Sequence, residues 1–97
     1  ILCMMGTTSS FAPRSPDDII SMAAIAAENR VPLLVNNAYG LQSTECTQRI
    51  AQARVEGRVD ACVQSLDKNF QVPVGGAIVA FFKQSQAAKF AQMYPGV

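Results

Sequence analysis

The chain has 97 residues, of which 49% are hydrophobic and only 15% are charged, with a net charge of +1. Charged residues make up about a quarter of an ordinary soluble domain, and a small domain should be more polar still because its surface is large relative to its volume. The composition therefore favours part of a larger protein, and its scattered basic residues form no stripe of the kind that binds nucleic acid.

The first half of the chain predicts a strand, a helix and a second strand. Residues 1–5 form a short apolar run, as in a buried strand. Ser15 as N-cap and Pro16 at the first helical position predict a helix that ends near Arg30. Residues 32–36 are again apolar and predict a second buried strand.

The second half predicts one more helix and strand, followed by a strand and a short helix. Ser43 is the predicted N-cap of a helix that runs to about Val55 and is stopped by the glycine that follows shortly after. Residues 59–65 predict the third buried strand, residues 77–82 the fourth, and residues 84–93 a final helix.

The order β-α-β-α-β-β-α predicts an α/β fold with helices covering the sheet faces. Strands that alternate with helices imply parallel pairing through right-handed crossovers. The connection between the third and fourth strands has no helix and is too short for a parallel crossover, which needs about a dozen residues or more. We therefore expect three parallel strands and one antiparallel strand.

Two classes of protein are disfavoured by local composition. The longest uncharged run, residues 69–82, is interrupted by proline and glycine, whereas a membrane span needs about 20 apolar residues. Cys3, Cys46 and Cys62 are widely spaced and histidine is absent, which argues against a disulfide framework and a zinc site. Buried, reduced thiols of a cytosolic protein are the simplest interpretation.

Polar clusters follow each of the first three predicted strands, at residues 7–10, 36–40 and 67–69. Ligands of open α/β sheets bind beyond the carboxyl ends of the parallel strands. No glycine-rich nucleotide fingerprint is present, which disfavours a nucleotide-binding domain. Lys68 remains as a candidate nucleophile toward a carbonyl, a role that requires a lowered pKa. The alternative is a solvated lysine paired with Asp67.

The layout of Asn36, Ala38, Tyr39 and Lys68 resembles pyridoxal-phosphate enzymes of the aspartate-aminotransferase fold type. A closer resemblance is to the O-phosphoseryl-tRNA(Sec):selenocysteine tRNA synthase family, also described as the soluble liver antigen family. That resemblance covers nearly the whole chain. It rests on four motifs in order: TTSSFAPR (7–14), VNNAYG (35–40), SLDKNF with VPVGGA (65–77), and MYPG (93–96).

The resemblance implies roles for three residues. Lys68 would form the Schiff base to pyridoxal 5'-phosphate and act as general base at the substrate Cα. Asn36 would face the pyridine nitrogen, where most of the fold type has a charged Asp, and Ala38 would pack against the cofactor ring. Asn36 as a turn residue and Ala38 as tight turn packing are the structural alternatives. Tyr39 is given no chemical role.

Two glycine- or hydroxyl-rich segments have less specific interpretations. The loop over residues 7–10 offers hydroxyl and N–H groups near the predicted site, although such a loop is often only a connection. Gly75 and Gly76 would let the backbone approach a phosphate or a neighbouring subunit, and a bend in the chain explains them equally well.

By the same resemblance, residues 1–97 would be an incomplete pyridoxal-phosphate-binding large domain of a fold-type I transferase. The parent enzyme would convert O-phosphoseryl-tRNA(Sec) to selenocysteinyl-tRNA(Sec) with selenophosphate, as a cytoplasmic homotetramer with no membrane association. We expect the 97 residues alone to be inactive. The alternatives are another fold-type I enzyme, such as a sulfur-transferring relative, and a non-catalytic α/β assembly module.

One position departs from the family pattern. The family is expected to carry a phosphate-binding arginine directly after the MYPG motif, where this chain has Val97. A valine cannot pair with a phosphate, whereas arginine does so through two hydrogen bonds. Val97 indicates either a sequence cut short at that point or an impaired copy of the enzyme, and we favour truncation.

Overall fold

The computed structural model describes residues 1–93. The MYPG motif beyond Met93 and the position of Val97 lie outside the described residues. The elements are β1 (Met4–Thr7), α1 (Ile19–Glu28), β2 (Leu33–Asn36), α2 (Thr44–Glu56), β3 (Ala61–Ser65), α3 (Leu66–Asn69), β4 (Ala77–Phe81) and α4 (Gln84–Met93).

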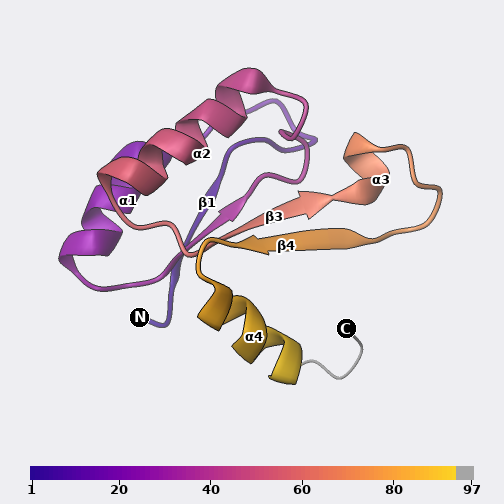
Figure 1. The fold of residues 1–97 in the computed structure, drawn as a ribbon. Helices are drawn as coiled ribbons and strands as arrows, with labels where there is room; N and C mark the ends of the chain where they lie inside the picture. Colours follow the sequence, from indigo (N-terminus) through magenta and orange to yellow (C-terminus); the bar gives the residue numbers. More distant parts are fainter. Residues whose placement is uncertain (94–97) are drawn as a thin grey trace.

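The four strands form one sheet in the order β1-β2-β3-β4 (Figure 1). β1 pairs with β2 and β2 with β3 in parallel, and β3 pairs with β4 antiparallel. The predicted fold class and element order are therefore confirmed. One difference is α3, a single helical turn where the sequence predicted only a polar exit from the third strand.

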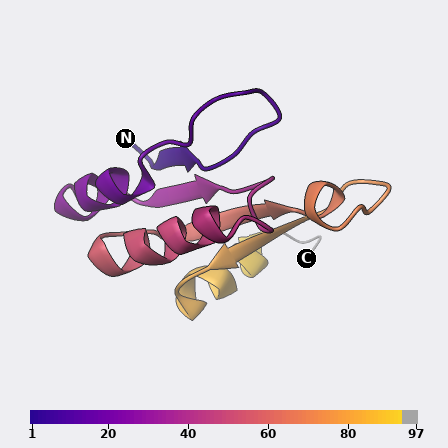
Figure 2. The same ribbon diagram turned by 90° about the horizontal axis from the view of Figure 1, so that it is seen from above.

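The hydrophobic core lies between the sheet and two helices. α1 and α2 lie side by side over one face of the sheet, and α4 lies on the other side (Figures 1 and 2). The core is built from α1, α2 and the central strands; its fully buried members are Ile19, Ala23, Ala26, Leu33, Val35 and Ala53. Small alanines on both helices let α1 and α2 approach each other closely, which fixes the loops that connect them to the strands.

β4 connects the two layers through adjacent phenylalanines. Phe82 packs against the core below α2, where the Arg54 guanidinium lies 5.0 Å from its ring centroid. The Phe81 ring contacts Phe90 of α4 with centroids 5.3 Å apart. Phe81 is the last residue of β4 and Phe82 directly follows it, so these two side chains anchor the end of β4 to both layers.

The start of α1 differs from the sequence prediction. Asp18, not Ser15, is the N-cap, and its carboxylate accepts hydrogen bonds from the Ser21 backbone N–H and hydroxyl at 3.2 and 2.7 Å. Asp17 N donates to Thr7 O at 2.9 Å, which holds the preceding segment against the end of β1. Asp17 also accepts a hydrogen bond from Thr7 N, so the residues before Asp18 lie along the end of β1 and α1 starts about one turn later than predicted. The predicted Ser43 cap of α2 is confirmed.

The cysteines are free thiols in different environments. Cys62 is buried in the core, and burial raises the pKa of its thiol to about 11. Cys46 is half-buried, and Cys3 is exposed because it precedes the first strand. The expectation of buried thiols therefore holds for Cys62 and is wrong for Cys3. Among residues 1–93, no helix has the length and apolar character needed to cross a membrane.

Asp60 is a nearly buried carboxylate just before β3. It accepts hydrogen bonds from Arg58 at 2.8 and 3.0 Å, from Leu33 N at 3.0 Å and from Gln86 Nε2 at 2.7 Å. Burial alone would raise the pKa of Asp60, and this is the largest single effect. The bonds from Arg58, Gln86 and Leu33 together outweigh it and hold the pKa below its ordinary value.

We expect Asp60→Asn to destabilise the fold by about 1–3 kcal/mol at pH 7, the range for a charged hydrogen-bonding group. Because the folded-state pKa is depressed, the contribution of Asp60 is complete above its unfolded pKa of about 3.9 and is lost as pH falls through the folded pKa. In urea denaturation, the difference between wild type and variant should therefore stay constant from pH 7 down to about pH 5 and shrink below about pH 4. Glu45→Gln, at an exposed carboxylate, is the control. A pH-independent difference would contradict this prediction.

Candidate active site

The polar clusters after β1, β2 and β3 meet at one edge of the sheet, as predicted. Asn37 connects all three strand ends and is completely buried. Its side-chain oxygen accepts a hydrogen bond from the Thr8 hydroxyl, and its Nδ2 donates to Gln64 Oε1 at 3.1 Å. Its backbone N–H donates to Val63 O at 3.0 Å. Asn37 therefore fixes the relative position of the three strand ends.

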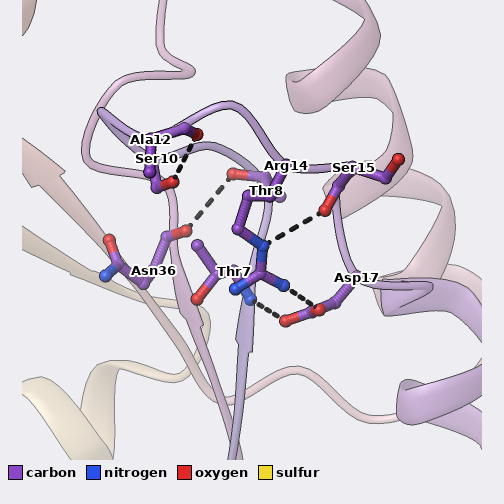
Figure 3. A network of polar contacts seen from close by, with 8 residues as sticks. All are labelled: Thr7, Thr8, Ser10, Ala12, Arg14, Ser15, Asp17 and Asn36. Atoms are coloured by element: carbon purple, nitrogen blue, oxygen red, sulfur yellow. Dashed lines mark hydrogen bonds and ion pairs between the residues drawn. The ribbon is translucent and has the colours of Figure 1, made fainter.

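The loop after β1 is held by the start of the α1 segment. Asp17 accepts a hydrogen bond from Thr7 N at 2.8 Å and pairs with the Arg14 guanidinium, whose Nε also donates to Ser15 O at 3.2 Å (Figure 3). Nearer to β1 in the same loop, Ser9 Oγ accepts a hydrogen bond from Tyr39 N at 3.2 Å. The hydroxyl-rich loop thus contacts the turn that follows β2.

Lys68 lies in α3, directly beyond the carboxyl end of β3. Its Nζ pairs with Asp67 Oδ2 at 2.6 Å and lies 5.6 Å from the centroid of the Tyr39 ring. The hydrogen bond to Asp67 holds the pKa of Lys68 above its ordinary value, with a smaller contribution from Tyr39, which is the opposite of the lowered pKa expected of a nucleophilic lysine. The pairing with Asp67 that the sequence suggested is therefore present, together with a contact to Tyr39 for which the sequence supplied no role.

Asn36 and Ala38 share a tight turn at the end of β2. The Asn36 side-chain oxygen accepts a hydrogen bond from Ala38 N at 3.1 Å. Within residues 1–93, the Asn36 Nδ2 makes no hydrogen bond, so the N–H donors are what Asn36 presents. Asn36 is thus a turn residue, as the structural alternative held, and also has a donor available for a ligand.

The glycine pair lies in the β3–β4 connection. Gly75 and Gly76 both have positive φ, 54° and 96°. Gly76 O accepts a hydrogen bond from Leu66 N at 3.1 Å. Since L-residues with side chains rarely adopt such conformations, the backbone geometry of this connection accounts for both glycines.

Two buried asparagines near the site were not singled out from the sequence. Asn37 and Asn69 are 0% and 4% exposed, and both bond to elements about 30 residues away in the chain. Polar residues that directly follow a buried strand, or directly follow Lys68, are the sequence signal that could have identified them. Within residues 1–93, no group of three or more His, Cys, Asp or Glu side chains could hold a metal ion.

A sequence model of the O-phosphoseryl-tRNA(Sec) selenium transferase family, SepSecS, matches residues 1–97. The O-phosphoseryl-tRNA(Sec) selenium transferase of Caenorhabditis elegans is 65% identical over 96 residues, which cover 99% of this chain and 20% of that protein. That of Methanopyrus kandleri is 38% identical over 93 residues, covering 96% of this chain and 22% of the relative.

A solved structure agrees with the sequence comparisons. The crystal structure of an archaeal O-phosphoseryl-tRNA(Sec) selenium transferase superposes with a TM-score of 0.84 at 32% identity, over 95% of this chain and 21% of that one. The chain thus spans about a fifth of the length of the relatives that it matches.

Proposed function

Because the chain belongs to the O-phosphoseryl-tRNA(Sec) selenium transferase family, we propose that the whole protein converts O-phosphoseryl-tRNA(Sec) to selenocysteinyl-tRNA(Sec) with pyridoxal phosphate as cofactor. In this proposal, residues 1–97 are part of the cofactor-binding large domain. The observation that carries it is the position of Lys68, beyond the end of β3 and beside the turn that holds Asn36, Ala38 and Tyr39.

The side chains at this edge of the sheet fit pyridoxal phosphate. Lys68 supplies a primary amine for the aldehyde, and Ala38 leaves room for a flat ring because its side chain ends at Cβ. Asn36 presents Nδ2 as a donor while its oxygen is occupied by Ala38 N. A neutral donor is complementary to an unprotonated pyridine nitrogen, whereas a carboxylate would keep that nitrogen protonated.

When bound, the cofactor supplies an electron sink for negative charge at the substrate Cα. Lys68 Nζ would hold the aldehyde carbon until the substrate amine displaces it, and the released amine would then take the proton from Cα. Asn36 would orient the ring without adding charge, which makes the sink weaker than in enzymes with Asp at this place. Elimination of phosphate tolerates a weaker sink because phosphate is a good leaving group. Selenium of selenophosphate would then bond to Cβ of the dehydroalanyl product while Cα regains a proton, and water would cleave the selenium–phosphorus bond and release phosphate.

Family membership also supports a proposal for the substrates, the oligomeric state and the cellular location of the whole protein. The substrate would be tRNA(Sec) carrying phosphoserine, the selenium donor selenophosphate, and the enzyme a homotetramer in the cytoplasm. The family match favours this reaction over that of a sulfur-transferring fold-type I relative.

Borohydride trapping on the full-length protein tests the cofactor assignment. After loading with pyridoxal phosphate and reduction, we expect a stable pyridoxyl group on Lys68 and none on Lys83 or Lys89. Attachment should quicken as pH rises, because Asp67 raises the pKa of Lys68 and only the neutral amine attacks an aldehyde. Peptide mapping by mass spectrometry locates the label. An unlabelled protein would support the non-catalytic assembly module instead.

A further inference from the structure

Asn69 is a buried polar side chain directly after Lys68, and it is 4% exposed. Buried amides are retained where their hydrogen bonds are satisfied, so the partners of Asn69 indicate what it does. Its Nδ2 donates to two backbone carbonyls, Ser65 O at 2.6 Å and Ala38 O at 2.7 Å. The first bond is local to the α3 turn, and the second reaches the turn after β2.

A second bond joins the same two segments. Gln42 Nε2 donates to the backbone oxygen of Asn69 at 2.6 Å. Asn69 is thus bonded to the β2–α2 connection through its side chain and through its main chain. The residues between these anchors, Ala38 and Tyr39 on one side and Lys68 on the other, are those of the proposed cofactor site.

α3 has little support of its own. It is four residues long, and its N-cap Ser65 makes no side-chain capping bond because the Ser65 hydroxyl pairs with Asp67. The helical bond from Phe70 N to Leu66 O, at 2.8 Å, closes a single turn. One helical turn is unstable without tertiary contacts, so the direction in which Lys68 points depends on what anchors the turn.

We propose that Asn69 is a positioning residue: its amide ties the Lys68 turn to Ala38 and thereby sets where Lys68 Nζ lies relative to Asn36, Ala38 and Tyr39. This inference rests on the proposed function, since it concerns the geometry of the lysine toward the cofactor. A displacement of about 1 Å in a reacting group can reduce a rate by about 100-fold, which makes such an anchor consequential.

Two substitutions separate the long-range bond from the local one. Asn69→Asp keeps the shape of the side chain but replaces the donor by an oxygen that faces two carbonyl oxygens. Asn69→Ser can still bond the carbonyl four residues earlier, as serine does in helices, but is too short to reach Ala38 O. Asn29→Asp is the matched control, because Asn29 Nδ2 donates to Ile25 O, also four residues earlier, at 2.9 Å on the exposed end of α1.

The readout is the rate at which borohydride-trapped pyridoxyl accumulates on Lys68 in the full-length protein, per folded molecule as judged by circular dichroism. We expect both Asn69 variants to lower this rate by about 10- to 100-fold and Asn29→Asp to leave it at the wild-type value. A purely structural role predicts fewer folded molecules with an unchanged rate in each. If Asn69→Asp does not fold, the trapping rate of Asn69→Ser, whose side chain is neutral and smaller, tests the positioning role.

The two proposals fail in different ways. Wild-type labelling on Lys68 with equal rates in the folded Asn69 variants would overturn the positioning role alone. An unlabelled Lys68 in the wild-type protein would overturn the proposed function, and the role of Asn69 with it.

Discussion

Lys68→Ala is expected to lower the turnover of O-phosphoseryl-tRNA(Sec) by the full-length protein by about 1,000-fold or more, in the upper part of the range for loss of a general acid–base group. Proton removal from Cα requires a base, and Lys68 Nζ is the amine beside the Asn36–Ala38 turn. Release of phosphate from the aminoacyl-tRNA under saturating conditions measures this step.

Lys68→Arg is the informative companion to that variant. Arginine keeps the positive charge and can still pair with Asp67, but it stays protonated at any pH of interest. We expect it to be as inactive as Lys68→Ala, which would show that the neutral amine matters and the ion pair does not. Lys83→Ala, at an exposed lysine before α4, should retain full turnover. Residual activity above about a tenth in Lys68→Ala would exclude the assigned role, given the range above.

Gly57→Ala is expected to destabilise the fold strongly. A Cβ at position 57 would lie 2.4 Å from the Ala23 carbonyl carbon, 2.5 Å from its oxygen and 2.7 Å from Ala24 N. These are backbone atoms of α1, which no rotation of a side chain can move away. Gly57 also ends α2, and the next residue donates from Arg58 N to Ala23 O at 3.0 Å. The extra methyl group would therefore force α1 and α2 apart.

The expected loss is about 3 kcal/mol or more, at the upper end for overpacking, because the obstacle is rigid. Gly6→Ala is the matched control: its Cβ would meet Ile19 Cδ1 at 2.5 Å and the Met22 side chain, and these chain ends can move. Urea denaturation followed by circular dichroism compares the two variants. A loss for Gly57→Ala no larger than that for Gly6→Ala would contradict the rigid contact between the helices.

The two predictions concern opposite ends of β3: Lys68 lies beyond its carboxyl end, and Gly57 precedes its amino end. Gly57 sets the distance between α1 and α2 near the amino ends of the strands. Ser43 caps the other end of α2, close to the turn that carries Tyr39 and the loop that carries Ser9. A shift of α2 would thus reach the candidate site through a short connection. We expect Gly57→Ala to slow pyridoxyl attachment at Lys68 in proportion to its disturbance of the contact between α1 and α2.

The polar sheet edge shows where sequence patterns suffice and where they do not. Strand ends at residues 7–10, 36–40 and 67–69 could be placed together from chain order alone, because parallel strands end at one edge. The residues whose hydrogen bonds join these strand ends could not be identified from chain order. Asn37 and Asn69 look like ordinary turn residues until the fold brings Thr8, Gln64 and Ala38 within hydrogen-bonding distance.

The start of α1 illustrates the same limit on a local feature. Ser15-Pro16 has a strong helix-start pattern, yet Asp17 is hydrogen-bonded to Thr7 at the end of β1, and Asp18 is the N-cap of a helix that begins at Ile19. The Ser43 cap has no such competitor, and there the local pattern predicts correctly. Local propensity decides a boundary when nothing distant binds the same backbone groups.

The sequence by itself determined the α/β class, the order of helices and strands along the chain with an antiparallel fourth strand, and the placement of Lys68 beyond the third strand. These follow from short-range periodicity and connection length, which act within a few residues. Only the tertiary structure decided that Lys68 lies against Tyr39, that Asn36 presents its amide N–H groups, and that Asn69 bonds to Ala38. Such contacts join residues about 30 positions apart, and their geometry depends on how helices and strands pack.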